Sequence, residues 1–258
     1  MAVSSEPSVR QELAESLRRP FLTARWESLL LLNYECPREL LEPLVPHGTV
    51  LDPWQGTPLV SLVGFMFRDT RVAGIGFPWH RTFEEVNLRF YVLRTTPEGE
   101  ARRSVVFIRE LVPRWIIATI ARLRYNEPYL AVPMDHHVDL NPKTGGEVSY
   151  SWRHQGTRYT LRGTAQGAMR DSAPGSEAEF ITEHYWGYTR QPDGGTLEYR
   201  VAHPRWQIWE LEDASFTGHS GKLYGTAFGE ILTQPPRSAF LAWGSEVEVY
   251  QGRRLSDV

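Results

Sequence analysis

A chain of 258 residues, with 41% hydrophobic and 23% charged residues, has the composition of a globular protein with a sizeable core, which excludes a disordered chain. Its formal net charge of −3 shows no excess of the positive charge that phosphate binding needs, so nucleic acid is not an expected partner. Cys36 is the only cysteine, which excludes an intrachain disulfide and a multi-cysteine metal site.

The beginning of the sequence and its apolar runs bear on the cellular compartment. Residues 1–20 include Glu6, Glu12 and Glu15 and lack an apolar segment, so no signal peptide is predicted. The longest apolar runs, at 29–32 and 115–118, are too short to span a bilayer. The expected compartment is therefore the cytoplasm, and a membrane is not an expected partner.

The first predicted elements are a helix, a strand and a second helix. Apolar residues at helical spacing predict a short amphipathic helix over 8–18, within an N-terminal arm formed by residues 1–19. A strand is expected over 21–34. A helix should then begin at Pro37 and end before Pro46, because proline suits the first turn of a helix and stops a helix that precedes it.

Three more strands and the most strongly periodic helix come next. The strands are expected at 58–68, 83–94 and 104–111. Pro113 then begins a helix whose apolar stripe consists of Ile116, Ile120 and Leu123.

Nearly everything after residue 129 reads as β structure. Strands are predicted at 129–140, 146–154, 157–168, 183–190, 196–203, 206–217 and 245–251. A weak helical pattern covers 222–232. Because no repeat or linker divides the sequence, it predicts one domain over 1–258, in which largely antiparallel sheets carry two or three peripheral helices.

The strand at 83–94 carries the most informative pattern. Side chains alternate across a strand, so one face holds Val86, Leu88, Phe90 and Val92 and the other holds Phe83, Glu85, Asn87, Arg89 and Tyr91. The second face is either solvated or the wall of a cavity. In a cavity, Arg89 would bind an anion, with Asn87 and Tyr91 beside it. Glu85 would be the catalytic acid or base if burial shifted its pKa.

A second candidate site depends on the register of a hairpin. If Asp193 and Gly194 form a two-residue loop, the opposed pairs are His184 with His203, Trp186 with Val201, and Tyr188 with Tyr199. His184, His203, Trp186 and Tyr188 then become candidate ligand-binding residues. A purely structural aromatic ladder explains the same pattern, and Gly195 allows a loop one residue longer, which would break the pairing.

No metal or cofactor is predicted. Asp135, His137 and Asp139 would share one face of a strand and are suitable ligand types for zinc or iron, but no supporting motif accompanies them. A solvated strand edge explains this cluster equally well. The sequence also lacks the glycine-rich motifs that bind nucleotides and the Gly-x-Ser-x-Gly motif of hydrolases.

Several segments together resemble the YqjF-like family of bacterial proteins. The matching stretches are 26–34, 43–46, 83–92, 122–129, 180–188 and 203–206, in the same order and spread over about residues 20–250. The resemblance implies the fold of the acetoacetate decarboxylase-like superfamily. That fold is mainly β, with curved and largely antiparallel sheets forming a barrel or cone around a central cavity.

The lysines depart from the pattern of the superfamily. Its decarboxylases form a Schiff base through a lysine, in a Pro-Lys-Lys motif whose nearest counterpart here is Pro113-Arg114-Trp115. Arginine stays protonated and cannot be an amine nucleophile. The chain has only Lys143 and Lys222, both in segments that read as exposed. The sequence therefore argues against Schiff-base decarboxylation.

Three functional hypotheses remain open. The leading one is a protein that binds a small acidic or carbonyl-bearing metabolite through Glu85, Asn87 and Arg89, as a lysine-independent lyase, hydratase or isomerase. The second is a noncatalytic carrier or sensor in which aromatic residues such as Trp186 and Tyr188 provide the affinity. The third is a structural or oligomerisation module. The sequence decides neither whether a reaction is catalysed nor whether a homo-oligomer forms.

Overall fold

The computed structural model describes residues 19–76, 81–113 and 126–255. The helices predicted at 8–18 and after Pro113 lie outside these residues.

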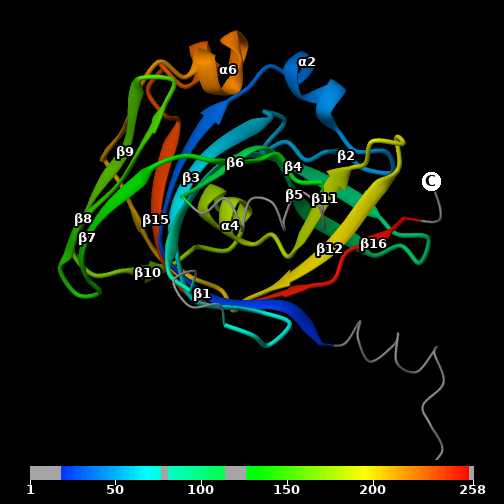
Figure 1. Cartoon of the computed structure of the whole chain (residues 1–258), viewed down its shortest axis with the longest axis horizontal. Helices are drawn as coiled ribbons and strands as arrows, with labels where there is room; N and C mark the ends of the chain where they lie inside the picture. The colour runs from blue at the N-terminus through cyan, green and yellow to red at the C-terminus, as the bar shows by residue number, and fades with distance from the viewer. Residues whose placement is uncertain (1–18, 77–80, 114–125, 256–258) are drawn as a thin grey trace, which may run out of the picture.

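The larger sheet closes into a ring (Figure 1). In order around the ring, its strands are β15 (Ser238–Tyr250), β1 (Pro20–Glu35), β3 (Leu59–Val72), β4 (Phe83–Thr95), β5 (Ala101–Val112), β11 (Trp186–Arg190) and β12 (Thr196–Ala202). The ring closes because β12 pairs with β15 as well as with β11. All these pairings are antiparallel except that of β5 with β11. The predicted curved, largely antiparallel sheet system is confirmed.

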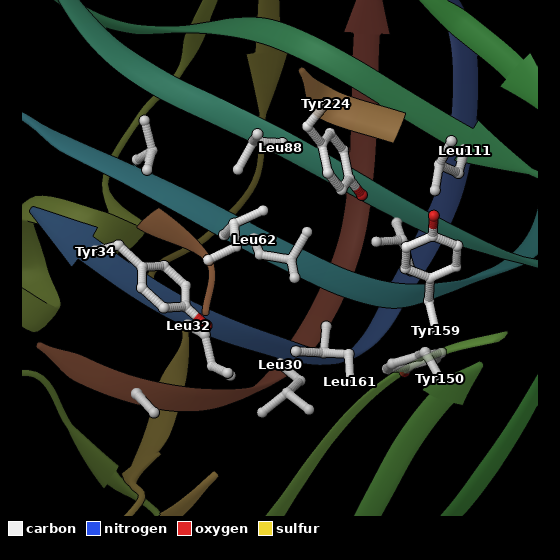
Figure 2. Packing of buried hydrophobic residues seen from close by; sticks show 14 of the residues in the cluster. Leu30, Leu32, Tyr34, Leu62, Leu88, Leu111, Tyr150, Tyr159, Leu161 and Tyr224 are labelled. Carbon is white, nitrogen blue, oxygen red and sulfur yellow. The ribbon is translucent and has the colours of Figure 1, made fainter. Parts of the chain in front are cut away.

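Short strands extend the ring, and a second sheet covers part of its outside. The short strands are β2 (Val50–Leu51), β6 (Tyr129–Ala131), β10 (Arg170–Asp171), β13 (Gln207–Glu210) and β16 (Arg253–Arg254). The second sheet consists of β14 (Asp213–Thr217), β9 (Thr157–Gln166), β8 (Gly145–His154) and β7 (Met134–Asn141). Between the two sheets lies an apolar core in which Leu30, Leu62 and Leu88 from the ring meet Tyr150 and Leu161 (Figure 2).

The described helices are short. They are α2 (Arg38–Leu41), the 3-10 helix η1 (Glu42–Leu44), α4 (Glu177–Thr182), α5 (Gly221–Tyr224) and α6 (Thr226–Ile231). Helix α4 lies within the ring (Figure 1), where Ala178, Phe180 and Ile181 pack against its inward-facing residues. The sequence prediction missed α4 and began the next strand three residues early, at 183. The Ser176 Oγ caps α4 by accepting a hydrogen bond from the Glu179 amide at 3.2 Å.

Two predicted strands are each divided between the two sheets. The stretch 129–140 contains β6 in the ring and β7 in the second sheet, separated by Val132 and Pro133. Likewise, 206–217 contains β13 and β14. The predicted helical stretch 222–232 is divided into α5 and α6 at Gly225, where φ is 88°. Alternation of side chains continues through such crossings, so it cannot reveal them.

A bulge in β1 changes which residues face the inside of the ring. Ser28 has a φ of 56°, and the register with β3 shifts between Glu27 and Leu30. Trp26 and Leu29 therefore both face inward, although their separation of three residues would place them on opposite faces of a regular strand. The hydroxyl of Tyr150 donates a hydrogen bond of 2.8 Å to the carbonyl of Ser28, so the second sheet holds the bulge in place.

A second irregularity lies in β5. Leu88 pairs with Arg109, but the next residue of β4, Arg89, pairs with Phe107, so Ile108 is an extra residue in β5. Phe107 before it and Glu110 after it both face the inside of the ring. Without the bulge, Glu110 would share a face with Val106, which packs in the core between the sheets. The bulge therefore places a carboxyl group inside the ring.

Candidate functional site

The ring encloses a cavity of about 130 Å³. Every strand of the ring contributes to its wall, and most of the wall is aromatic or aliphatic; examples are Trp26, Phe65, Phe67, Phe83, Phe107 and Val249. Phe67 and Phe83 stack with their ring centroids 4.7 Å apart. An apolar cavity of roughly 150 Å³ holds benzene, so this space suits a small molecule.

The polar face of β4 lines the cavity, as one of the two sequence interpretations predicted. Phe83, Glu85, Asn87 and Arg89 are part of the wall, whereas Val86, Leu88, Phe90 and Val92 lie in the core between the sheets. Tyr91 is not part of the wall. Its hydroxyl lies 2.5 Å from the Ser61 Oγ, and its ring packs 4.6 Å from the ring of His184. Tyr91 therefore supports the site from behind.

Glu85 has the environment of an acid–base group. Its Oε1 accepts a hydrogen bond of 3.1 Å from the Asn87 amide, and its Oε2 accepts one of 3.1 Å from the Tyr129 hydroxyl. Burial raises the pKa of Glu85 to about 7, although these hydrogen bonds and the charge of Arg89 act to lower the pKa. Near neutral pH, Glu85 can therefore give or take a proton.

Two further glutamates line the cavity, and sequence reasoning missed both. Glu85, Glu110 and Glu127 are 3%, 2% and 5% exposed. Glu127 Oε1 accepts hydrogen bonds from the hydroxyls of Thr189 and of Tyr199, the latter at 2.9 Å. Burial raises the pKa of Glu127 to about 7 against these hydrogen bonds. The available signal was an acidic residue in an apolar strand for Glu110 and one just before Pro128 for Glu127.

Glu110 differs from the other two carboxyls. Its Oε2 is buried and has no hydrogen-bond partner among the described residues. Burial raises the pKa of Glu110 well above its ordinary value, and the nearby charges of Glu127 and Glu85 raise it further. The three carboxyls thus share a small, largely apolar cavity, in which burial and their mutual repulsion oppose the ionisation of all three.

Arg89 and His184 contribute nitrogen atoms to the wall. Arg89 Nη2 donates a hydrogen bond of 3.3 Å to the carbonyl of Ile181, and its buried Nε has no partner among the described residues. Neither ring nitrogen of His184 has such a partner. Burial lowers the pKa of His184 well below 6.5, and the charges of Arg89 and Arg103 lower it further. The imidazole is therefore neutral.

The predicted register of the hairpin is wrong by one residue. Trp186 pairs with Arg200 and Tyr188 with Glu198, because the loop runs over 191–195 and is closed by a hydrogen bond of 2.8 Å from the Gln191 amide to the Gly195 carbonyl. His184 lies before β11, so it is not opposed to His203. The glycine at 195 lengthened the loop beyond the two-residue turn.

The candidate residues of the hairpin lie in different surroundings. Trp186 lines the cavity, with the guanidinium of Arg102 4.0 Å from its ring centroid. Tyr188 does not; its hydroxyl donates a hydrogen bond of 2.6 Å to Glu198. His203 stacks on Trp206 at 4.1 Å and lines a separate surface groove. Of the four candidates, the structure brings only His184 and Trp186 to the cavity.

The histidines at 136 and 137 do not line the cavity. Asp135, His136 and His137 are exposed on β7, and His136 Nδ1 lies 2.5 Å from the carboxylate of Glu84 on β4. Within the described ranges, no group of three or more His, Cys, Asp or Glu side chains is arranged to hold a metal ion. This cluster joins the two sheets through the His136–Glu84 contact.

The two lysines of the chain are both exposed and both outside the cavity. Lys143 lies between β7 and β8, and Lys222 lies on α5. Since the chain has no other lysine, no lysine amine is available there for a Schiff base. Among the described residues, no helix has the length and apolarity to cross a membrane.

Solved structures with this fold include acetoacetate decarboxylases and related enzymes. Acetoacetate decarboxylase from Legionella pneumophila is 12% identical, with a TM-score of 0.64 over 99% of this chain and 98% of that chain. An acetoacetate decarboxylase-like enzyme from Sphingomonas wittichii is 13% identical, with a TM-score of 0.62 over 92% and 94% of the two chains. The enduracididine biosynthesis enzyme MppR, complexed with pyruvate, is 14% identical, with a TM-score of 0.63 over 100% and 98%.

These similarities establish the acetoacetate decarboxylase-like fold. None of the curated proteins compared matches the chain. A family model described as an uncharacterized conserved protein matches residues 23–246, which is most of the sequence. The chain therefore belongs to the DUF2071 family.

Proposed function

We propose that this protein binds a small carbonyl- or carboxylate-bearing molecule inside the ring and acts on it by acid–base chemistry, as a lyase, hydratase or isomerase that needs no Schiff base. The observation that carries the proposal is the set of buried polar atoms without partners in an otherwise apolar cavity. They are Asn87 Oδ1, Arg89 Nε, Glu110 Oε2 and both ring nitrogens of His184. Such atoms are costly unless something bonds to them, and a ligand with oxygen atoms can do so.

The wall suggests how the ligand lies. Arg89 and Asn87 are neighbours on one face of β4 and offer a donor and an acceptor to the polar end of the ligand. Glu85, next in the row, is the acid–base group. The aromatic residues around Phe67 and Phe83 receive the apolar part. In support, MppR, a protein of the same fold, has been solved in complex with pyruvate.

Removing Arg89 tests the binding role. Small keto acids, ketones, aldehydes and hydroxy acids should be screened by thermal unfolding of the wild type and of Arg89→Ala. A ligand at about 100 times its Kd stabilises the folded state by about 2.7 kcal/mol. We expect a rise in Tm for one chemical class, which Arg89→Ala abolishes. Arg68→Ala, which changes a half-exposed arginine outside the cavity, should keep the rise.

The binding proposal fails if no compound of these classes raises the Tm of the wild type. Equal shifts in the wild type and in Arg89→Ala would remove Arg89 from the binding site.

A noncatalytic carrier or sensor is the second candidate, because the predominantly apolar wall can provide affinity without any reaction. Glu85→Gln separates the two. For an enzyme, the variant should lower turnover by about 10²-fold or more while it keeps most of the ligand affinity, since glutamine preserves the shape of the side chain. For a carrier, affinity is similarly unchanged but the wild type shows no turnover of any bound compound, as NMR of the ligand will report.

A further inference from the structure

The three carboxyls of the cavity differ in what surrounds their oxygen atoms. Both oxygens of Glu85 accept hydrogen bonds, from Asn87 and from Tyr129. Glu127 Oε1 accepts two, from Thr189 and Tyr199. Donors aimed at a carboxyl favour its ionised form. The hydrogen bonds to Glu85 and Glu127 therefore favour their ionised forms.

The surroundings of Glu110 instead favour its protonated, neutral form. Its backbone lies directly opposite Asn87 on one side and Tyr129 on the other, in a row across β4, β5 and β6. The Tyr129 hydroxyl contacts both Glu110 and Glu85. Of the groups that face Glu110, two are carboxyls, while its Oε2 receives no hydrogen bond from the described residues. Proximity to two carboxylates and the unpaired Oε2 both favour the neutral form, and they outweigh the hydrogen bond with the Tyr129 hydroxyl, which favours the ionised form.

We infer that Glu110 is the proton donor of this site: a neutral carboxylic acid that donates to the carbonyl oxygen of the ligand, with ionised Glu85 as the base. The substrate class is then a small carbonyl compound with a hydrogen on the carbon next to the carbonyl. This inference rests on the proposed function, since it takes the same cavity as the binding site.

The step is balanced without a cofactor or an oxidant. The carboxylate of Glu85 removes the proton from the carbon next to the carbonyl, and the electron pair of that C–H bond becomes the C=C bond of an enol. Glu110 transfers its proton to the carbonyl oxygen and becomes the carboxylate. The site holds one negative charge from this pair before and after the step, so no net charge is created in the apolar cavity.

Return of a proton from the site to a carbon atom of the enol completes the reaction. Return of a proton to the same carbon exchanges hydrogen with solvent, whereas its return at a different carbon produces an isomer. The Tyr129 hydroxyl contacts both carboxyls and can carry the proton from one to the other.

The reaction can be followed without knowledge of the natural substrate. Pyruvate, butanone and cyclohexanone should be incubated with the protein in D2O, and the loss of hydrogen next to the carbonyl followed by proton NMR. We expect the wild type to accelerate exchange for at least one of them. Glu110→Gln should lower that rate by about 10²-fold or more while ligand binding persists, because the glutamine amide still donates a hydrogen bond.

Two variants make the result specific. Glu110→Asp keeps the acid and should recover part of the rate. Glu84→Gln makes the same change in the neighbouring residue of Glu85, which contacts His136 and does not line the cavity; its exchange rate should equal that of the wild type. An unchanged rate in Glu110→Gln overturns the role of Glu110.

Infrared spectroscopy tests the protonated state without any ligand. At pH 8, where Glu85 and Glu127, with a pKa of about 7, are mostly ionised, the wild type should show the C=O stretch of a buried carboxylic acid, and Glu110→Gln should lack this band. Glu84→Gln should retain it. If the wild type has no such band, the inference is wrong even if a ligand binds.

The two proposals fail in different ways. If a carbonyl compound binds but no exchange is accelerated, the inference about Glu110 falls while the binding function stands. If none of the three compounds nor any other in the thermal screen binds, the proposed function itself falls.

Discussion

Replacing Glu198 by alanine is expected to lower the free energy of unfolding by about 3–5 kcal/mol, because it removes one member of a buried group of charges. The side chain of Glu198 is fully buried. Its Oε1 lies 2.8 Å from nitrogens of both Arg102 and Arg253, and its Oε2 lies 3.3 Å from Arg94 and accepts a hydrogen bond from Tyr188. Without this carboxylate, Arg94 and Arg102, whose side chains are 5% and 12% exposed, would lose the counter-charge that they share.

Urea unfolding followed by circular dichroism measures the loss. The control is Glu100→Ala, since Glu100 pairs with the same Arg102 but is 55% exposed. An exposed pair contributes about 0–1 kcal/mol, so this variant should stay close to the wild type. A loss below 1 kcal/mol for Glu198→Ala would contradict this prediction.

The free energy of unfolding should fall as pH rises through the range in which the cavity carboxyls ionise. The folded-state pKa of Glu85 and of Glu127 is about 7, above the ordinary value of 4.5, so between these values the folded state binds more protons than the unfolded state. The stabilisation is complete below pH 4.5 and is lost as pH approaches 7. A shift from 4.5 to 7 corresponds to about 3 kcal/mol for one independent group, and less for each when the groups interact.

His184 works in the opposite direction. Because its folded pKa is lowered, the unfolded state binds the extra proton below pH 6.5, and this contribution rises as pH increases towards 6.5. The comparison of variants separates the two effects. The stability of Glu85→Gln minus that of the wild type should increase from pH 5 to pH 8 by about 1–3 kcal/mol. A flat difference for Glu85→Gln would contradict the prediction.

The row of polar side chains on β4 could be predicted because the alternation of side chains along a strand is a local property of the backbone. Alternation places Glu85, Asn87 and Arg89 on one face whatever the rest of the chain does, and the structure puts that face on the cavity. The sequence left open whether the face was solvated. The answer depends on the closure of the ring by β12 and β15, segments far from β4 in the chain.

Glu110 could not be predicted, because the same rule fails where a strand has a bulge. The extra residue Ile108 reverses the face of everything after it in β5. The register of the hairpin failed for a similar reason, since one residue more in the loop changes every pair. Helix α4 has only six residues, too few to produce a recognisable helical period of apolar residues. In each case one residue or one turn of backbone decides the outcome.

The two faces of β4 contact different regions of the protein, and this affects how sequences of the family can diversify. Residues 86, 88, 90 and 92 bury apolar side chains between the sheets, whereas 83, 85, 87 and 89 form part of the cavity wall. Since alternate positions of one strand contact different regions, substitutions at odd-numbered positions can change the lining of the cavity without altering the core between the sheets. The even-numbered positions then preserve the packing between the sheets while single substitutions at the odd-numbered positions alter the polarity and shape of the cavity.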